Sequence, residues 1–236
     1  MEIVLVRHAQ PDWEPNERAV DDPGLTNLGR AQAARIAEQL AEEHFDAVYL
    51  SPLRRVVETA APYLEATGLK GEARDWLRET GLPSLEGQTR AQVEAYFAHA
   101  KAREFAEWWD GLPGGERFLH FYERVSGGLE ALLGDGHTAH IHQEAGQRLW
   151  EIDREDQRVL IFAHEGTNAV LVSHLIGAAP VPWNHLRFST SWAGITRLHT
   201  VRIGSRWVWS MEAFNRLSHL QDLDDGDAGS GRSGSG

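Results

Sequence analysis

Two arginines, two histidines and a glutamate follow short apolar segments that are far apart in the chain. Arg7 and His8 follow EIVLV (2–6), Arg55 follows DAVYL (46–50), Glu79 follows EARDW (72–76) and His164 follows VLIFA (159–163). Arginine guanidinium groups bind tetrahedral oxyanions through paired hydrogen bonds, and a neutral imidazole can attack phosphorus as a nucleophile. A fold that brings these side chains together would therefore form a site for a phosphate group.

The elements that must position these residues are short apolar runs alternating with segments of helical pattern. Helices are expected over about 27–42, 53–67, 89–109, 115–133 and 167–176, and two late strands near 193–200 and 206–213. Strands that alternate with helices, several of them apolar throughout, indicate a largely parallel sheet covered on both faces. We predict an α/β fold, a three-layer α/β/α sandwich with a mostly parallel central sheet. Ligands of such sheets bind beyond the carboxyl ends of the strands, where the five polar residues stand.

Length and composition predict one domain followed by a tail. The chain has 236 residues, of which 42% are hydrophobic, enough for one sizeable core. We expect this domain over 1–221, with an excursion from it at about 84–150 that shapes the substrate pocket. The segment 222–236, DLDDGDAGSGRSGSG, is acidic and then Gly/Ser-rich, which predicts a disordered tail.

Charge and residue content exclude several classes of partner. The formal net charge of −12 argues against a binder of nucleic acid or of anionic membranes. The chain has no cysteine, and no apolar run approaches the roughly 20 residues of a membrane span. We therefore expect a cytoplasmic protein that contacts neither nucleic acid nor membrane, with a homodimer left open.

Seven short segments, in order along the chain, resemble the motifs of the histidine phosphatase superfamily, also called phosphoglycerate mutase-like. They are RHAQ (7–10), LTNLGRAQ (25–32), SPLRRVVETA (51–60), LRETGLPSLEG (77–87), PGGER (113–117), AHEGT (163–167) and NRLSHL (215–220). The family counterparts of the first and sixth are Arg-His-Gly-Glu and Ser-His-Gly-Gly. Each segment is weak evidence alone, but the seven in this order are specific, and the resemblance covers about 2–221.

The resemblance implies a phosphoglycerate mutase-like fold and a role for each polar residue. His8 would attack the phosphoryl group and form a phosphohistidine, and Glu79 would protonate the departing alkoxide. Arg7, Arg55 and His164 would hold the phosphoryl oxygens, which is the electrostatic contribution that dominates phosphoryl transfer. The expected activity is that of a phosphoric monoester hydrolase acting on a small phosphorylated metabolite, with no metal and no other cofactor.

Some positions depart from the family pattern. Ala9 and Glu165 stand where the family has glycine, and we expect the Glu165 carboxylate to turn away from the phosphate pocket, because it would repel the substrate. The family's Trp-Asn pair appears as Trp13-Glu14, so Asn16 is the candidate for the asparagine that contacts phosphate. Glu86 is the rival to Glu79 as proton donor.

Two alternative functions stay open, and two further features need an interpretation. A phosphoglycerate mutase would have to protect its phosphohistidine from water, and a non-catalytic module would only bind a phosphorylated ligand; hydrolysis is favoured because the mutase sequences after both histidines are not matched. His137, His140 and His142 have spacings that could hold a metal, but their polar segment is more typical of a solvated loop. Trp108 and Trp109 are candidates for a wall of the substrate cleft.

Overall fold

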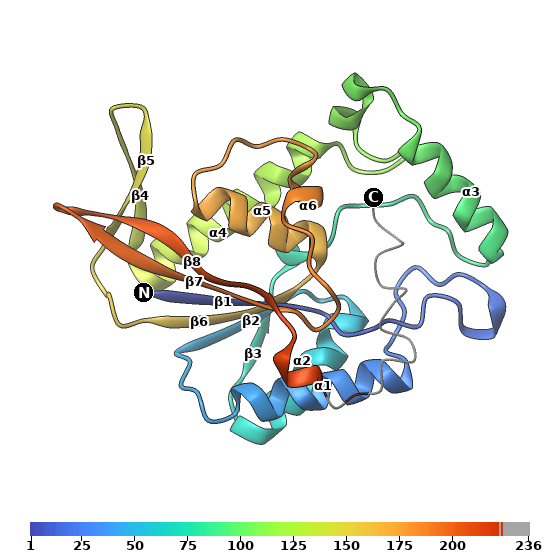
Figure 1. The fold of residues 1–236 in the computed structure, drawn as a ribbon, viewed down its shortest axis with the longest axis horizontal. Helices are drawn as coiled ribbons and strands as arrows, with labels where there is room; N and C mark the ends of the chain where they lie inside the picture. Colours follow the sequence, from blue (N-terminus) through green and yellow to red (C-terminus); the bar gives the residue numbers. More distant parts are fainter. Residues whose placement is uncertain (222, 224–236) are drawn as a thin grey trace.

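The computed structural model describes residues 1–221 and 223, so the tail predicted over 222–236 lies outside the described residues except for Leu223. Eight strands form one sheet in the order β3-β2-β6-β1-β7-β8-β5-β4. Their bounds are β1 Glu2–Arg7, β2 Ala47–Leu50, β3 Gly71–Ala73, β4 Ala139–Glu144, β5 Gln147–Ile152, β6 Arg158–Ala163, β7 Ile195–Ile203 and β8 Arg206–Arg216. Helices cover both faces of this sheet, as predicted for an α/β/α sandwich (Figure 1).

The sheet is parallel in only one half. β1 pairs in parallel with β6, β6 with β2, and β2 with β3, whereas β7, β8, β5 and β4 continue the sheet from β1 in antiparallel pairs. The prediction of a mostly parallel sheet was therefore too broad, because it holds only for the half from β1 to β3. The physical reason is that β4–β5 and β7–β8 are hairpins, which close through short turns and need no crossover helix.

The helices form two layers, one on each face. Helices α1 (Asn27–Leu40) and α2 (Arg54–Thr67) lie on one face, and α4 (Phe118–His137) and α5 (Glu165–Leu175) lie on the other (Figure 1). The fold is completed by α3 (Arg90–Lys101), by the short helix α6 (Asn184–Arg187) and by the 3₁₀ helices η1 Pro15–Glu17, η2 Asp75–Leu77, η3 Phe105–Asp110 and η4 Ser218–Leu220. None of the described helices is long and apolar enough to cross a membrane.

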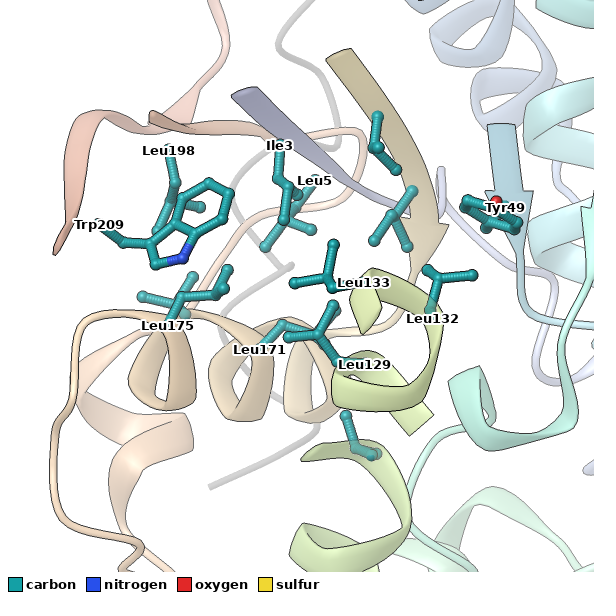
Figure 2. Packing of buried hydrophobic residues seen from close by; sticks show 14 of the residues in the cluster. Ile3, Leu5, Tyr49, Leu129, Leu132, Leu133, Leu171, Leu175, Leu198 and Trp209 are labelled. Atoms are coloured by element: carbon teal, nitrogen blue, oxygen red, sulfur yellow. The ribbon is translucent and has the colours of Figure 1, made fainter. Parts of the chain in front are cut away.

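The alternation of side chains along β1 explains why two cores form. Ile3 and Leu5 belong to the buried cluster on the α4–α5 face, whereas Val4 and Val6 belong to the cluster on the α1–α2 face. Successive residues of a strand point to opposite faces, so an uninterrupted apolar run is what a doubly covered strand requires. Figure 2 shows the first cluster, in which leucines of α4 and α5 pack against Ile3 and Leu5. The strand is thereby held from both sides up to its last residue, Arg7.

Several predicted elements have different bounds. The strand expected at 72–76 is shorter, because β3 ends at Ala73 and η2 follows. The helix expected over 89–109 is broken into α3 and η3, and the one expected over 115–133 runs from Phe118 to His137. Within the segment expected to be an excursion, α4 packs its Val125, Leu129 and Leu133 into the core of the sheet.

Candidate active site

The carboxyl ends of three neighbouring strands bring the predicted histidines together. The backbone N–H of His8 donates to the carbonyl of Ala163 at 2.9 Å, and that of Ser51 donates to the carbonyl of Phe162 at 3.0 Å. This pairing continues β1 and β2 by one residue each along β6. The ring centroids of His8 and His164 are consequently 5.2 Å apart, although the two residues are far apart in the chain.

The His8 ring is buried and held in one tautomer. Its Nδ1 lies 2.8 Å from the carbonyl oxygen of Ala9, and a carbonyl only accepts, so Nδ1 carries the proton. The lone pair is therefore on Nε2. Burial lowers the pKa of His8 well below 6.5, and the cations of Arg55 and Arg7 lower it further. His8 is thus a neutral imidazole at pH 7, which is the nucleophilic form.

His164 lies beside His8 and is also neutral. Its Nε2 is hydrogen-bonded to the hydroxyl of Ser51 at 2.8 Å, and the side chain is completely buried. Burial, with the nearby Arg55 cation, holds the pKa of His164 well below its ordinary value. Among the residues that the structure describes, none offers its buried Nδ1 a hydrogen-bond partner.

Arg7 and Arg55 place two buried positive charges around these rings. Arg7 is the last residue of β1, and Arg55 lies in the first turn of α2, with 8% and 4% of their surface exposed. Burial lowers the pKa of Arg55 to about 10, so the group stays protonated at neutral pH. Within the described part of the chain, the Nε atoms of both arginines are buried and lack an acceptor. Buried donors of this kind are normally satisfied, so the pair is suited to bind an anion.

Each guanidinium is also fixed by the protein. Nη1 of Arg7 donates to the backbone carbonyl of Thr190. The guanidinium of Arg55 lies 4.9 Å from the ring centroid of Trp13, and its Nη1 is 3.7 Å from Oδ1 of Asp22. These contacts restrict the arginine rotamers before any ligand binds, which reduces the entropy lost on binding.

The Glu79 carboxylate faces the same group of residues. Its Oε2 accepts from the backbone N–H of Gly166 at 2.9 Å, and its Oε1 accepts from the N–H of Thr80 at 2.9 Å. Burial lowers the pKa of both Arg7 and Arg55, and the negative charge of Glu79 opposes that shift in each, which places the carboxylate within electrostatic reach of the anion site. The structure thus gathers His8, Glu79 and His164 with the two arginines.

Glu86, the alternative candidate for the proton donor, lies on the surface. It is exposed, and its Oε2 accepts from the backbone N–H of Asp21 at 2.9 Å. In return the Oδ1 of Asp21 accepts from the N–H of Leu85 at 2.9 Å. Glu86 therefore joins the loop after β1 to the loop after Glu79. Its observed contact is with backbone, and its candidacy as proton donor stays a prediction.

Arg124, on α4, holds the backbone around Glu79. Its guanidinium donates to the carbonyls of Trp76, Arg78 and Glu79 at 3.0, 3.1 and 3.3 Å, and to both carboxylate oxygens of Glu116 at 3.0 and 2.7 Å. Glu116 in turn accepts from the N–H of Gly81 at 3.1 Å. The chain is thus held on both sides of Glu79. Sequence reasoning missed Arg124, because nothing in a helical pattern marks one arginine as a partner of a distant loop.

Two predictions about single residues have different outcomes. Asn16 lies in η1 with a left-handed backbone conformation (φ 58°) and is exposed, and its contact with phosphate stays a prediction. The expectation that Glu165 turns away from the phosphate pocket is wrong in part: its Oε2 lies 2.9 Å from Nη1 of Arg7, so the carboxylate stays at the site, although on the side of the guanidinium away from Nε. The buried position at the start of α5 leaves the carboxylate to pair with the nearest cation, because an unpaired buried charge is costly.

The two tryptophans of η3 pack against α6 and the residue just before it. Trp108 stacks on the ring of His185 with centroids 5.9 Å apart, and Trp109 meets the edge of Trp183 at 6.1 Å. Phe105 lies 4.9 Å from Trp183 and is 68% exposed. η3 therefore packs against α6, which precedes the segment that carries Thr190. Whether this aromatic group forms a wall for substrate stays a prediction.

The segment with three histidines is not a solvated loop. His140 and His142 lie on β4 of the β4–β5 hairpin, and His137 ends α4, buried against the hydroxyl of Tyr49 at 3.1 Å. The described residues contain no group of three or more ligands that could hold a metal ion. His140 and His142 point to the same face of β4, but His137 ends α4 and both of its ring nitrogens are engaged, by Tyr49 and Gln157. The three imidazoles therefore do not form one site.

Comparison with known proteins identifies the family. The sequence profile of the histidine phosphatase superfamily (branch 1) matches residues 3–211. The chain belongs to this superfamily. The matched range includes all six predicted site residues, from Arg7 to His164.

Individual relatives of this superfamily are similar over most of their length. Phosphoserine phosphatase 1 of Hydrogenobacter thermophilus is 32% identical over 184 residues, which are 75% of this chain and 77% of the relative. Glucosyl-3-phosphoglycerate phosphatase of Mycobacterium tuberculosis is 29% identical over 232 residues, 92% of this chain and 96% of the relative. The solved native structure of the mycobacterial glucosyl-3-phosphoglycerate phosphatase has a TM-score of 0.70 at 27% identity, covering 92% of this chain and 99% of that one. The predicted family, fold class and class of enzyme, a phosphoric monoester hydrolase, are confirmed.

Proposed function

We propose that this histidine phosphatase hydrolyses a small alkyl phosphate through a phosphohistidine at Nε2 of His8, without a metal ion. The observation that carries the proposal is the tautomer of His8: Nδ1 donates to the Ala9 carbonyl, so Nε2 has its lone pair next to two buried arginines. A nucleophile, an anion site and a carboxyl group stand together at one edge of the sheet.

The first step makes a bond from Nε2 of His8 to phosphorus and breaks the bond from phosphorus to the substrate oxygen. The departing oxygen takes a proton from the carboxyl group of Glu79 and leaves as an alcohol. Arg7 and Arg55 hold the charge that spreads over the phosphoryl oxygens, and His164 hydrogen-bonds one of them through its buried Nδ1. The positive charge that other phosphatases take from metal ions is here supplied by the two arginines.

The second step returns the site to its starting state. Water attacks phosphorus and gives a proton to the Glu79 carboxylate, while the bond from phosphorus to Nε2 breaks and inorganic phosphate forms. Glu79 is thereby protonated again for the next turnover. Hydrolysis rather than mutase activity is supported by the two phosphatases reported above, which are named for phosphoserine and glucosyl-3-phosphoglycerate. Both names refer to phosphomonoesters of small molecules, and we infer a substrate of this class.

The test measures phosphate release from p-nitrophenyl phosphate, phosphoserine, glucosyl-3-phosphoglycerate and 3-phosphoglycerate, with EDTA present. Phosphate release that EDTA does not change is expected, together with an acid-labile phosphohistidine in rapidly quenched protein. His8→Ala should lower kcat by more than about 10³-fold and abolish the phosphorylated form of the protein. Residual activity within tenfold of wild type would contradict the covalent mechanism. Conversion of 3-phosphoglycerate to its 2-isomer without phosphate release would favour the mutase instead.

A further inference from the structure

The carboxylate of Glu165 is built into the phosphate site itself. Glu165 follows His164 directly, begins α5 and is buried, with 7% of its surface exposed. Its Oε2 lies 2.9 Å from Nη1 of Arg7, and its Oε1 accepts from the hydroxyl of Ser189 at 2.6 Å. The family motif that this segment resembles has glycine at this position, so the second carboxylate is a feature of this chain.

The contacts of Arg7 divide its guanidinium into two parts. Nη1 is engaged by the protein, since it contacts both the Thr190 carbonyl and Glu165. Nε is buried, and no acceptor among the described residues reaches it. Nε and Nη2 form the side edge of the guanidinium, which can hold two oxygens of a phosphoryl group at once. Glu165 therefore binds Arg7 on the end opposite to the edge that serves the substrate.

The contact with Glu165 also changes the net charge around the phosphate site. His8 and His164 are neutral, because burial and the arginines hold the pKa of each well below 6.5. Among the described residues, the positive charges that these rings face at close range are those of Arg7 and Arg55, and Asp22 already offsets part of the charge of Arg55. Glu165 adds a second negative charge in contact with Arg7. Repulsion between like charges is strong where water is largely excluded, so the phosphate dianion is bound less tightly than two free arginines would bind it.

We propose that Glu165 sets the affinity of the site for the phosphate dianion: it orients Arg7 and at the same time weakens the hold on inorganic phosphate, so that the product leaves. The proposal rests on the proposed function of the site as a phosphate site. It makes Glu165 a positioning and affinity-determining residue, distinct from the groups that touch the reacting atoms.

The variant that separates charge from geometry is Glu165→Gln. Glutamine keeps the size of the side chain and an oxygen that can accept from Nη1 of Arg7, but it removes the negative charge. Glu165→Ala removes both the charge and the tether. Glu144→Gln is the matched control, because it makes the same change of net charge at the tip of the β4–β5 hairpin. β4 is the edge strand of the sheet, separated from β1 by β7, β8 and β5 (Figure 1).

The experiment measures the Kd of inorganic phosphate at pH 7 by titration calorimetry for wild type and the three variants, after circular dichroism has shown which of them are folded. Glu165→Gln is expected to lower Kd by about tenfold, and Glu144→Gln to leave it within twofold. Glu165→Ala should bind phosphate less tightly than Glu165→Gln, because Arg7 loses its anchor. As a second readout, phosphate should inhibit hydrolysis of p-nitrophenyl phosphate by Glu165→Gln at correspondingly lower concentration.

An unchanged or raised Kd in folded Glu165→Gln would overturn the proposal, and so would an equal fall in Kd in Glu144→Gln. The binding readout does not depend on turnover. A wild-type protein that hydrolyses no phosphomonoester but shows the expected shift would overturn the proposed function and leave the inference standing. Absence of phosphate binding in wild type would overturn both.

Discussion

The carboxylate of Glu79 accepts a hydrogen bond from the backbone N–H of Gly166 at 2.9 Å, two residues after His164. The turn from β6 into α5 therefore holds both the second histidine and the proposed proton donor. A Cβ atom at position 166 would lie 2.5 Å from Oε1 of Glu79, which only glycine avoids. The position of the acid thus depends on a residue without a side chain.

Gly166→Ala should displace Glu79 while leaving the nucleophile in place. We expect kcat to fall on the order of 10²-fold on an alkyl phosphate and clearly less on p-nitrophenyl phosphate, whose leaving group departs almost without a proton. Gly127→Ala is the matched control, because a Cβ there meets nothing within 4 Å. Equal losses on the two substrates would contradict the displacement of a proton donor.

Glu79→Gln tests the same role directly. The amide keeps the size of the side chain but has no proton to give, so the loss should again be on the order of 10²-fold or more on an alkyl phosphate and smaller on p-nitrophenyl phosphate. Glu86→Gln, at the exposed residue that bonds the N–H of Asp21, should show no dependence on the leaving group. A larger dependence in Glu86→Gln than in Glu79→Gln would move the acid role to Glu86.

Arg124→Ala should make the backbone around Glu79 more mobile. Three carbonyls and the Glu116 carboxylate lose their donor, and we expect a loss of about 2 kcal/mol or more in the free energy of unfolding. The activity should fall more on an alkyl phosphate than on p-nitrophenyl phosphate. Arg117→Ala, which removes an exposed ion pair with Asp110, is the control and should change stability by less than about 1 kcal/mol. A uniform loss on both substrates would mean that Arg124 has only a structural role.

The pH dependence of kcat/KM should report the low pKa of His8. An imidazole with the ordinary pKa of about 6.5 is about nine-tenths protonated at pH 5.5 and cannot attack. Because burial, Arg55 and Arg7 lower the pKa of His8, we expect kcat/KM on p-nitrophenyl phosphate to keep more than half of its pH 7 value at pH 5.5. Arg55→Gln should weaken catalysis and also move the acidic limb toward pH 6.5. A wild-type limb centred at 6.5 would show that His8 is not perturbed.

Acid should destabilise the fold through the buried His174. Burial and the Arg148 cation lower the pKa of His174 to about 4, although Nε2 of its ring lies 2.9 Å from the partly exposed carboxylate of Glu130. The unfolded chain binds this proton near pH 6.5, so between pH 6.5 and about 4 acid favours the unfolded state, by about 1.4 kcal/mol per pH unit. Between pH 7 and pH 4.5, the free energy of unfolding of wild type should fall by on the order of 3 kcal/mol more than that of His174→Gln, measured by denaturant unfolding. His99→Gln, at an exposed histidine of α3, is the control and should lose as much free energy of unfolding as wild type over this pH range. Equal slopes in wild type and His174→Gln would contradict the prediction.

The sequence by itself determined the parallel half of the sheet, its helices and the members of the site. The apolar run of β1 needs cover on both faces, and that requirement is local information carried by the side chains of Ile3 to Val6. Parallel strands end at one edge, so polar residues just after such runs meet whatever the length of the intervening chain. For this reason His8, Arg55 and His164 could be placed together before the fold was known. The one-domain boundary at 221 and a homodimer stay predictions.

Only the tertiary structure decided the contacts that tune the site. Arg124 reaches the carbonyl of Glu79 across 45 positions of chain, and Arg7 reaches that of Thr190 across 183. Pairing of this kind depends on how helices and loops pack on the sheet, and no local periodicity encodes it. The direction of Glu165 was misjudged in part for the same reason. From sequence the carboxylate was weighed against a phosphate alone. In the fold the buried guanidinium of Arg7 lies 2.9 Å away, and the cost of an unpaired buried charge decides where the side chain points.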